Sequence, residues 1–265
     1  MMWTLITKTW LDQRRALLAW SLGLVAICSV QLWIYPTIKK SGAGIGQLID
    51  AFPDALKQIF RMQDYTSGPG YLTTELFSLM LPLIMIAVGA SSGARATAQD
   101  EEDGTADLLL TLPITRRRVL ASKVLATLVI FIGIGLLTFL TIYIGARLVD
   151  LKVPTSNLAA GAVTCASLGF LFSALACLAG TISGRRATSL GMVIGFALAM
   201  YLVFSLAPLV DTFDLVTPLN PFEWALGKSP VFNGWDAPGV TKLLVLSAVL
   251  YVSAFFTFDR RDIRA

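Results

Sequence analysis

Long apolar stretches alternate with short polar segments along all 265 residues of the chain. Each stretch has the length of about 20 mostly apolar residues that a helix needs to cross a bilayer. The pattern predicts six membrane-spanning helices, near residues 16–36, 72–92, 124–146, 157–182, 188–209 and 240–258. We therefore expect an all-α, polytopic membrane protein that forms one transmembrane domain over residues 1–265, because little chain is left for a soluble domain.

The fourth and fifth spans are the least clearly separated pair, because only the segment from Ser183 to Ala187 lies between them. That segment contains Arg185 and Arg186. An arginine at the middle of a bilayer costs about 2.5 to 3.5 kcal/mol on insertion scales, so burying both would cost roughly 5 to 7 kcal/mol. A tight turn at the membrane surface costs less, and we predict a turn here.

Composition supports the same class of protein. Of the residues, 55% are hydrophobic and 14% are charged, whereas roughly a quarter of the residues of a soluble domain are charged. The net charge of +4 fits the excess of basic residues that membrane proteins carry on their cytoplasmic side, so no nucleic-acid partner is expected. Cys28, Cys165 and Cys177 all fall within predicted spans, and we interpret them as buried small hydrophobic residues rather than disulfide or metal ligands.

The distribution of basic residues predicts the orientation in the membrane. Six spans place both termini on one side, and 13 of the 21 lysines and arginines fall on that side, which predicts that it is cytoplasmic. We therefore expect a multi-pass protein of the cell membrane with both termini inside. The 13 residues are Lys8, Arg14, Arg15, Arg95, Arg116, Arg117, Arg118, Lys123, Arg185, Arg186, Arg260, Arg261 and Arg264.

A short amphipathic pattern precedes the first span. Trp3, Ile6 and Trp10 recur at helical spacing, and Arg14 and Arg15 follow them. This pattern predicts an interfacial helix with its two tryptophans at headgroup depth. The alternative is an ordinary aromatic flank of the first span. Because that span does not end in a small-residue cleavage site, we expect it to be retained as an anchor.

Two outer loops carry their own helical signals. The loop over residues 37–71 has apolar residues at helical spacing and a proline at position 53, which predicts an amphipathic helix interrupted near Pro53. The loop over residues 210–239 contains four prolines, and we expect a short, proline-broken structure against the outer membrane surface. Three GxxxG pairs, beginning at Gly89, Gly180 and Gly191, indicate close helix packing within the bundle or at a dimer seam.

The densest charge lies between the second and third spans, over residues 93–123. An acidic run from Asp100 to Asp103 leads into Gly104 and Thr105, and the residues from Ala106 to Leu112 form a leucine-rich run before Pro113. A helix there has about two turns, and isolated helices this short are marginal in water, so it should need a surface to lie against. Downstream, Thr115 is in position to cap the third span.

Three arginines, Arg116 to Arg118, occupy the first turn of that third span. Cations at a helix N-terminus oppose the helix dipole by about 0.3 to 1 kcal/mol each, so helix physics does not explain them. Anionic headgroups or an acidic partner surface would explain the three arginines, and simple positive-inside anchoring is an alternative explanation.

In this loop the chain resembles the permease subunits of ABC-2 type transporters, closest to the bacterial branch that lacks a fused ATPase. In that family the loop carries a glutamate, a Gly-Thr pair, a leucine-rich short helix, then Pro, a hydroxyl residue and Arg, with a lysine near the start of the third span. The matching residues are Glu102, Gly104, Thr105, Leu108, Leu109, Pro113, Thr115, Arg116 and Lys123.

The resemblance implies a membrane subunit that pairs with a second permease copy, or a related permease, and binds two cytoplasmic ATP-binding cassette subunits. The segment 105–112 would be the coupling helix, and the N-terminal helix with Trp3, Trp10, Arg14 and Arg15 would be a second contact. ATP and Mg would be bound by the partner subunits, with no cofactor on this chain. The resemblance further implies an exporter, without identifying its cargo.

Other classes of function have weaker support in the residues. Gly227-Lys228-Ser229 has the ending of a Walker A motif, but Phe222 stands where the motif needs its first glycine. The chain has no histidine, which excludes His-based triads and His metal sites. An intramembrane enzyme would need paired acids in a cavity, and an ATP-independent secondary transporter or channel would be expected to show intramembrane charges or broken-helix repeats. We therefore expect no catalytic site on this chain.

Overall fold

The computed structural model describes residues 2–62, 64–102 and 115–260, and every regular element in these ranges is helical. Six of the helices are long and apolar enough to cross a membrane, over Gln13–Lys40, Gly68–Thr97, Arg117–Leu148, Thr155–Ser183, Arg186–Leu209 and Ala237–Asp259. These ranges agree with the six predicted spans, so the predicted fold class is confirmed and the chain is a multi-pass membrane protein.

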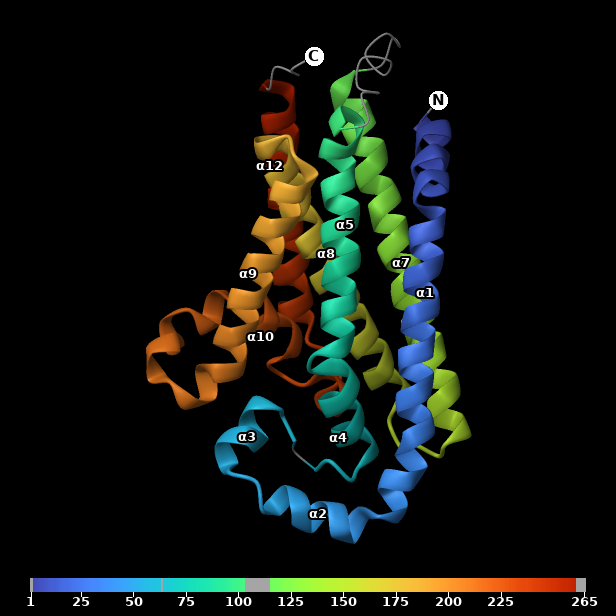
Figure 1. Cartoon of the computed structure of the whole chain (residues 1–265), viewed down its shortest axis with the longest axis vertical. Coiled ribbons are helices and arrows are strands. Elements are labelled where there is room, and N and C mark those ends of the chain that lie inside the picture. The colour runs from blue at the N-terminus through green and yellow to red at the C-terminus, as the bar shows by residue number, and fades with distance from the viewer. Residues whose placement is uncertain (1, 63, 103–114, 261–265) are drawn as a thin grey trace.

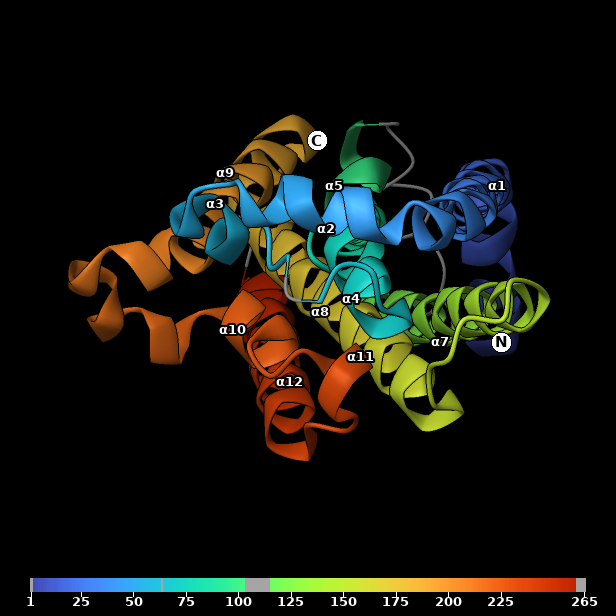
Figure 2. The ribbon, with the colours of Figure 1, turned by 90° about the horizontal axis from the view of Figure 1, so that it is seen from below.

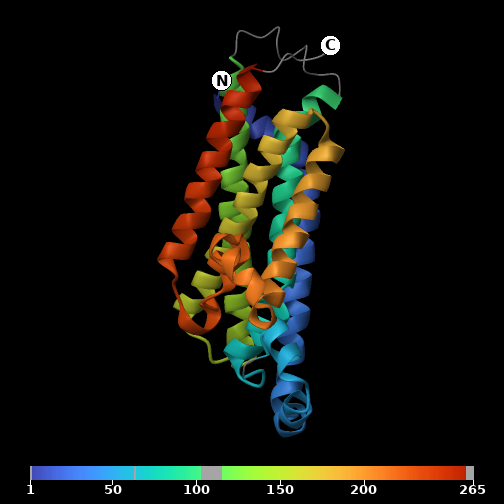
Figure 3. The ribbon, with the colours of Figure 1, turned by 90° about the vertical axis from the view of Figure 1, so that its left-hand side faces the viewer.

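The long helices form an upright bundle (Figures 1 and 3). They are α1 (Met2–Lys40), α5 (Met80–Glu102), α7 (Arg116–Leu148), α8 (Thr155–Ser183), α9 (Arg186–Leu206) and α12 (Ala237–Arg260). The start of α1 and the end of α12 lie at the same end of the bundle (Figure 1), which we call the terminal end. The opposite end, which carries the long connections, is called the loop end.

Helix α8 lies at the centre of the bundle. Figure 2 shows it between α5, α7 and α12, and 72% of its most apolar window is buried, against 17% for α1 and 22% for α9. The close approach of α5 to α8 depends on glycines, because a Cβ at Gly89 would lie 2.2 Å from the carbonyl oxygen of Gly169. A Cβ at Gly93 would lie 2.1 Å from the carbonyl oxygen of Ser173. These two helices therefore pack backbone against backbone, as small residues allow in membranes.

The three GxxxG pairs have different roles in the structure. Gly89 and Gly93 pack against α8, and Gly180 faces the side chain of Thr97 on α5. A Cβ at Gly191 or Gly195, by contrast, would meet nothing within 4 Å. The first pair therefore packs within the bundle, whereas the pair on α9 faces outward in a single copy of the chain.

The turn predicted between the fourth and fifth spans is confirmed. Helix α8 ends at Ser183, and Gly184 takes the left-handed conformation with φ 66° and ψ 6°, which glycine adopts without a steric penalty. Arg185 is extended and precedes the first residue of α9. The three cysteines are buried, as predicted.

At its N-terminus the chain differs from the expected arrangement in one respect. Residues 2–40 form one continuous α-helix, so no break separates the predicted interfacial helix from the first span. The sequence from Trp3 to Arg15 contains neither glycine nor proline that would end a helix. The contacts of Trp3, Trp10, Arg14 and Arg15 with the membrane interface stay a prediction.

The loop end contains short helices in both connections. The first connection holds α2 (Gly42–Asp50) and α3 (Asp54–Ile59), which are separated at Pro53 as predicted. It continues into α4 (Gly68–Leu72) and a π-helix at Thr73–Phe77 before α5 begins. The second holds 3-10 turns at Ala207–Leu209, Asp211–Leu215 and Thr217–Leu219, then α10 (Pro221–Leu226) and α11 (Pro230–Asn233).

Prolines begin the two α-helices of the second connection, α10 and α11, where their missing N–H costs nothing. Asn220 fixes the segment, because its Oδ1 accepts a hydrogen bond from the N–H of Phe222 at 2.9 Å and its Nδ2 donates to the carbonyl of Met200 at 2.8 Å. The predicted proline-broken structure is therefore present, and its contact with the membrane surface stays a prediction.

Candidate functional site

The charged loop between the second and third spans connects α5 to α7 at the terminal end. Helix α5 ends at Glu102 and α7 begins at Arg116. Five residues of the predicted coupling site, namely Gly104, Thr105, Leu108, Leu109 and Pro113, lie outside the described residues, as does the predicted short helix over 105–112. The two ends of the site are held by the described helices α5 and α7.

Thr115 occupies the capping position of α7. Its backbone is extended, with φ −69° and ψ 142°, and its carbonyl oxygen accepts from the N–H of Arg118 at 2.9 Å and of Val119 at 3.3 Å. Its side chain makes no capping hydrogen bond. The predicted position of the helix start is confirmed, and the expected side-chain cap is absent.

Arg117, the second residue of α7, forms an ion pair with Asp259 near the end of α12. The side chains are 66% and 28% exposed, so the pair contributes little to stability by itself. It does give one of the three arginines a partner within the chain, which the sequence did not reveal because 142 positions separate the two residues. The only hint in the sequence was that the two residues have opposite charges and lie at the same end of their respective spans.

Lys123 ties the start of α7 to the end of α5. Its Nζ donates a hydrogen bond to the backbone carbonyl oxygen of Ala96 at 3.1 Å. Lysine is long enough to reach the backbone of a neighbouring helix, and a charged donor makes a stronger hydrogen bond than a neutral one. The two helices that enter and leave the charged loop are therefore held together about two helical turns from the loop itself.

The end of α5 is also joined to α8, which is joined in turn to α9. Thr97 Oγ1 donates to the carbonyl of Cys177 at 3.4 Å, and Ser189 Oγ of α9 donates to the carbonyl of Ala176 at 2.7 Å. Because Gly93 brings the backbone of α5 against Ser173 in the same region, α5, α8 and α9 form a tightly packed support on one side of the loop.

Positive charge collects beside this support. Arg95 of α5 lies close enough to Arg186 of α9 for their like charges to interact. Arg118 and Arg185 are exposed at the same end. Such a cluster suits an acidic partner surface or anionic headgroups, since either lowers the repulsion between the arginines.

A polar cluster at the loop end joins side chains of α1 to those of the first connection. Tyr65 Oη donates to Glu75 Oε1 at 2.6 Å, and Gln31 Nε2 donates to Glu75 Oε2 at 3.4 Å. The hydroxyl of Tyr71 donates to the backbone carbonyl of Gln31 at 2.8 Å. Burial and the hydrogen bond to Glu75 raise the pKa of Tyr65, which keeps the phenol protonated. The cluster therefore joins α1 to the π-helix.

The hydrogen-bond partners of Glu75 in the described residues are a tyrosine and a glutamine, with no second carboxylate among them. General acid and base catalysis by paired carboxylates needs two such groups with different pKa values. Within the described ranges no group of three or more Cys, Asp or Glu side chains could hold a metal ion. The loop-end cluster thus gives no support to the intramembrane-enzyme alternative.

The family comparison agrees with the six-span bundle and its charged loop. Comparison with curated proteins finds no match for the chain. A family model described as ABC-2 family transporter protein matches residues 3–263, which is nearly the whole chain. The match includes the continuous first helix, the loop between α5 and α7, and the proline-broken connection before α12. The chain therefore belongs to the ABC-2 family of transporter proteins.

Proposed function

We propose that this chain is the permease subunit of an ABC exporter in the cell membrane, with both termini in the cytoplasm. ATP and Mg are bound and ATP is hydrolysed on two separate ATP-binding cassette subunits, and this chain carries no catalytic site. Family membership supports the transporter role, and the basic terminal end supports its cytoplasmic orientation.

The observation that carries the proposal is the way in which the structure holds both ends of the charged loop. Helix α5 is packed backbone to backbone on α8, whereas α7 is joined to α5 by the hydrogen bond from Lys123 and to α12 by the ion pair of Arg117. A partner that pushes on residues 103–114 would therefore meet a fixed support at α5. Because side-chain contacts such as those of Lys123 and Arg117 yield more easily than backbone packing, the movement would pass mainly into α7.

Within that loop, the proposed contacts with the ATPase subunit are Glu102, Gly104, Thr105, Leu108, Leu109, Pro113, Thr115 and Arg116. The short leucine-rich segment needs a surface to become stable, and a groove of the ATPase would provide one. Trp3, Trp10, Arg14 and Arg15 on the first part of α1 form a second contact at the same end of the bundle.

The chain works as a dimer with a second permease copy or a related permease. Helix α9 is only 22% buried in its most apolar window, and Figure 2 shows it at the margin of the bundle. Its Gly191 and Gly195 have open space beside them, and Ile194 and Leu198 are 56% and 59% exposed. Small residues flanked by large apolar ones on an open face suit close packing between membrane helices.

ATP turnover measured with the ATPase subunit tests the coupling role. The permease would be purified together with its partner ATP-binding cassette subunit and reconstituted in lipid nanodiscs. The Glu102→Gln and Arg116→Gln variants are expected to retain the complex and to lower the permease-dependent part of ATP hydrolysis. The matched controls are Glu101→Gln, which lies beside the proposed contacts, and Lys40→Gln, which removes an exposed basic residue at the opposite end of the bundle.

The proposal would be wrong if the controls and the test variants lowered turnover equally, or if the permease bound no ATPase subunit. Accessibility labelling of a cysteine at position 104 in intact cells provides an independent check of orientation. A cysteine introduced at this position should react only with membrane-permeant reagents.

A further inference from the structure

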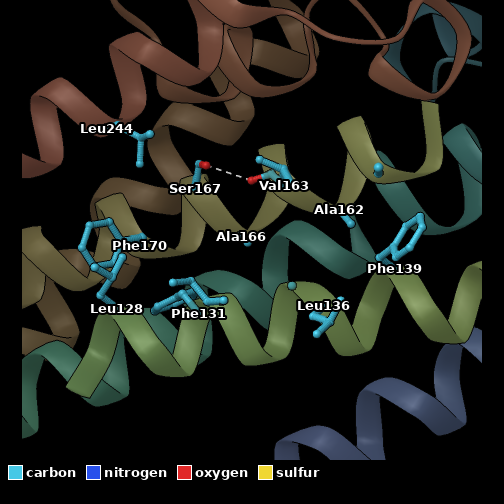
Figure 4. Close-up of a pocket in the computed structure, with 13 residues that line it drawn as sticks. Leu128, Phe131, Leu136, Phe139, Ala162, Val163, Ala166, Ser167, Phe170 and Leu244 are labelled. Carbon is cyan, nitrogen blue, oxygen red and sulfur yellow. Dashed lines mark hydrogen bonds between the residues drawn. The ribbon is translucent and has the colours of Figure 1, made fainter. Parts of the chain in front are cut away.

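An apolar groove of about 440 Å³ runs along the face formed by α7, α8 and α12 (Figure 4). Small residues of α8 form its floor, among them Ala159, Ala162 and Ala166, and larger side chains such as Phe139 of α7 and Leu244 of α12 stand beside them. The groove exists because alanines leave room between helices that carry bulky residues on either side.

The groove is open to the membrane and is almost free of polar groups. Ile132 and Leu136 at its edge are 62% and 56% exposed. The one hydroxyl in the lining, of Ser167, donates to the backbone carbonyl of Val163 at 2.8 Å. An apolar chain in the groove would therefore leave no polar group of the protein unsatisfied.

A second, polar pocket of about 550 Å³ lies beyond the groove toward the loop end. It is lined by Tyr143, Arg147, Asp150, Lys152 and Thr155, together with neighbouring residues of the α7–α8 connection. Groove and pocket lie on the same helix faces. Along α7 the spacing from Phe139 to Tyr143 and then Arg147 is four residues each, and the rings of the first two are stacked at 5.7 Å, as i, i+4 neighbours can be.

The same continuity holds on α8, where Thr155 lines the pocket and Ala159, Ala162 and Ala166 line the groove. These positions are three or four residues apart and therefore share one face of the helix. The two cavities thus form one elongated site with an apolar and a polar part.

The dimensions of this site match one leaflet of a bilayer. From Leu128 to Phe139 the groove follows α7 for eleven residues, or about 16 Å at 1.5 Å per residue, which is close to half of a hydrocarbon core of about 30 Å. The middle of the span Arg117–Leu148 lies near residue 132, and Arg147 is about 22 Å along the helix from that point, at headgroup depth in a bilayer of about 40 to 45 Å. Tyr143 lies between them and, as an amphipathic ring, suits the boundary between hydrocarbon and headgroup.

The charges of the pocket favour an anion. Asp150 is paired with Lys39 of α1 at 3.6 Å. Arg147 stacks over the Tyr143 ring at 5.4 Å, and among the described residues neither Arg147 nor Lys152 has an acidic partner. With the one carboxylate already paired, two basic groups remain to bind a phosphate.

We propose that the groove and the pocket together form a site for one anionic phospholipid of the leaflet at the loop end. One acyl chain lies along α7 and α8 between Leu128 and Phe139, and the phosphate lies between Arg147 and Lys152. This site is separate from the coupling loop, which is at the opposite end of the bundle.

Lipid retention measured by native mass spectrometry tests the site. The whole protein in detergent would be titrated with phosphatidylglycerol and, in parallel, with phosphatidylcholine of the same chain length. The expected result is tighter binding of one phosphatidylglycerol per chain. Arg147→Gln and Lys152→Gln should each weaken this binding about fivefold, and the Val163→Phe variant, which fills the groove, should abolish it.

Two matched controls separate the site from general lipid adhesion. Lys57→Gln removes a basic residue at the same end, and Val129→Phe enlarges an exposed valine of α7 that does not line the groove. Both should bind lipid as the unchanged protein does. If Val163→Phe lowers the melting temperature strongly, Ala159→Phe fills the same groove in its place.

Equal affinity for the two lipids would overturn the assignment to an anionic lipid. Unchanged phosphatidylglycerol binding in folded Val163→Phe and Ala159→Phe proteins would overturn the assignment of the groove.

Discussion

Replacing Gly93 by alanine should separate two helices that the bundle holds in direct backbone contact. The added Cβ would lie 2.1 Å from the carbonyl oxygen of Ser173 and 2.9 Å from both its carbonyl carbon and the Cβ of Ala176. Ordinary contacts of a Cβ begin at 3.4 Å, so α5 and α8 would have to move apart by more than 1 Å. The nearest obstacle is backbone, which cannot rotate away as a flexible side chain does.

The expected cost follows from this geometry. Inserting a methyl group into a well-packed interior costs about 1 to 3 kcal/mol, and a membrane bundle has little hydrophobic force to restore lost helix contacts. For a protein of this size, each kcal/mol changes the melting temperature by about 2 to 4 °C. Gly93→Ala should therefore lower the melting temperature by about 2 to 12 °C.

Thermal unfolding in detergent, followed by near-UV circular dichroism, measures this effect. Gly133→Ala is the matched control, because a Cβ at Gly133 of α7 would meet nothing within 4 Å. Alanine is intrinsically more favourable than glycine in a helix by up to about 1 kcal/mol, so the control should be neutral or slightly stabilised. Equal melting temperatures for the two variants would refute the close α5–α8 contact.

Three further outcomes test the contacts around the two ends of the bundle. Lys123→Met should destabilise the protein by about 1.5 kcal/mol because it removes a charged hydrogen bond between α7 and α5, and chemical denaturation should show the loss. In a double-mutant cycle, Arg117→Gln and Asp259→Asn should have a coupling energy of about 0.2 to 1 kcal/mol that decreases in high salt; a larger, salt-independent value would contradict an exposed pair. Tyr65→Phe should cost about 1 kcal/mol by removing a donor from the π-helix carboxylate, and a melting temperature equal to that of the unchanged protein would contradict this role.

The spans could be predicted from sequence because their signal is local. Twenty consecutive apolar residues carry the information without reference to the rest of the chain, and the cost of burying two arginines was sufficient to separate α8 from α9. Prolines likewise marked the interruptions at Pro53 and in the connection before α12. The amphipathic pattern near Trp3 predicted a helix, and the structure has one, but such a pattern contains no signal for a break, and the helix continues into the span.

The role of each GxxxG pair could not be predicted in the same way. The pairs beginning at Gly89 and Gly191 are identical as patterns, yet the first packs against α8 and the second is open. Which neighbour a glycine faces depends on the rotation of its helix in the bundle. The partner of Arg117 was hidden for the same reason, because several spans end in charges and only the packed structure selects Asp259.

The proposed lipid site and the proposed coupling site both depend on the position of α7 relative to α8. Helix α8 is the floor of the groove and the fixed neighbour of α5, whereas α7 forms a wall of the groove and begins where the coupling loop ends. If the ATPase subunits move α7 relative to α8, the width of the groove changes during the cycle. Binding equilibria that share a moving element affect each other equally in both directions. A bound anionic lipid should then shift the nucleotide affinity of the assembled transporter, whereas the Val163→Phe variant should show no such shift between membranes with and without anionic lipid.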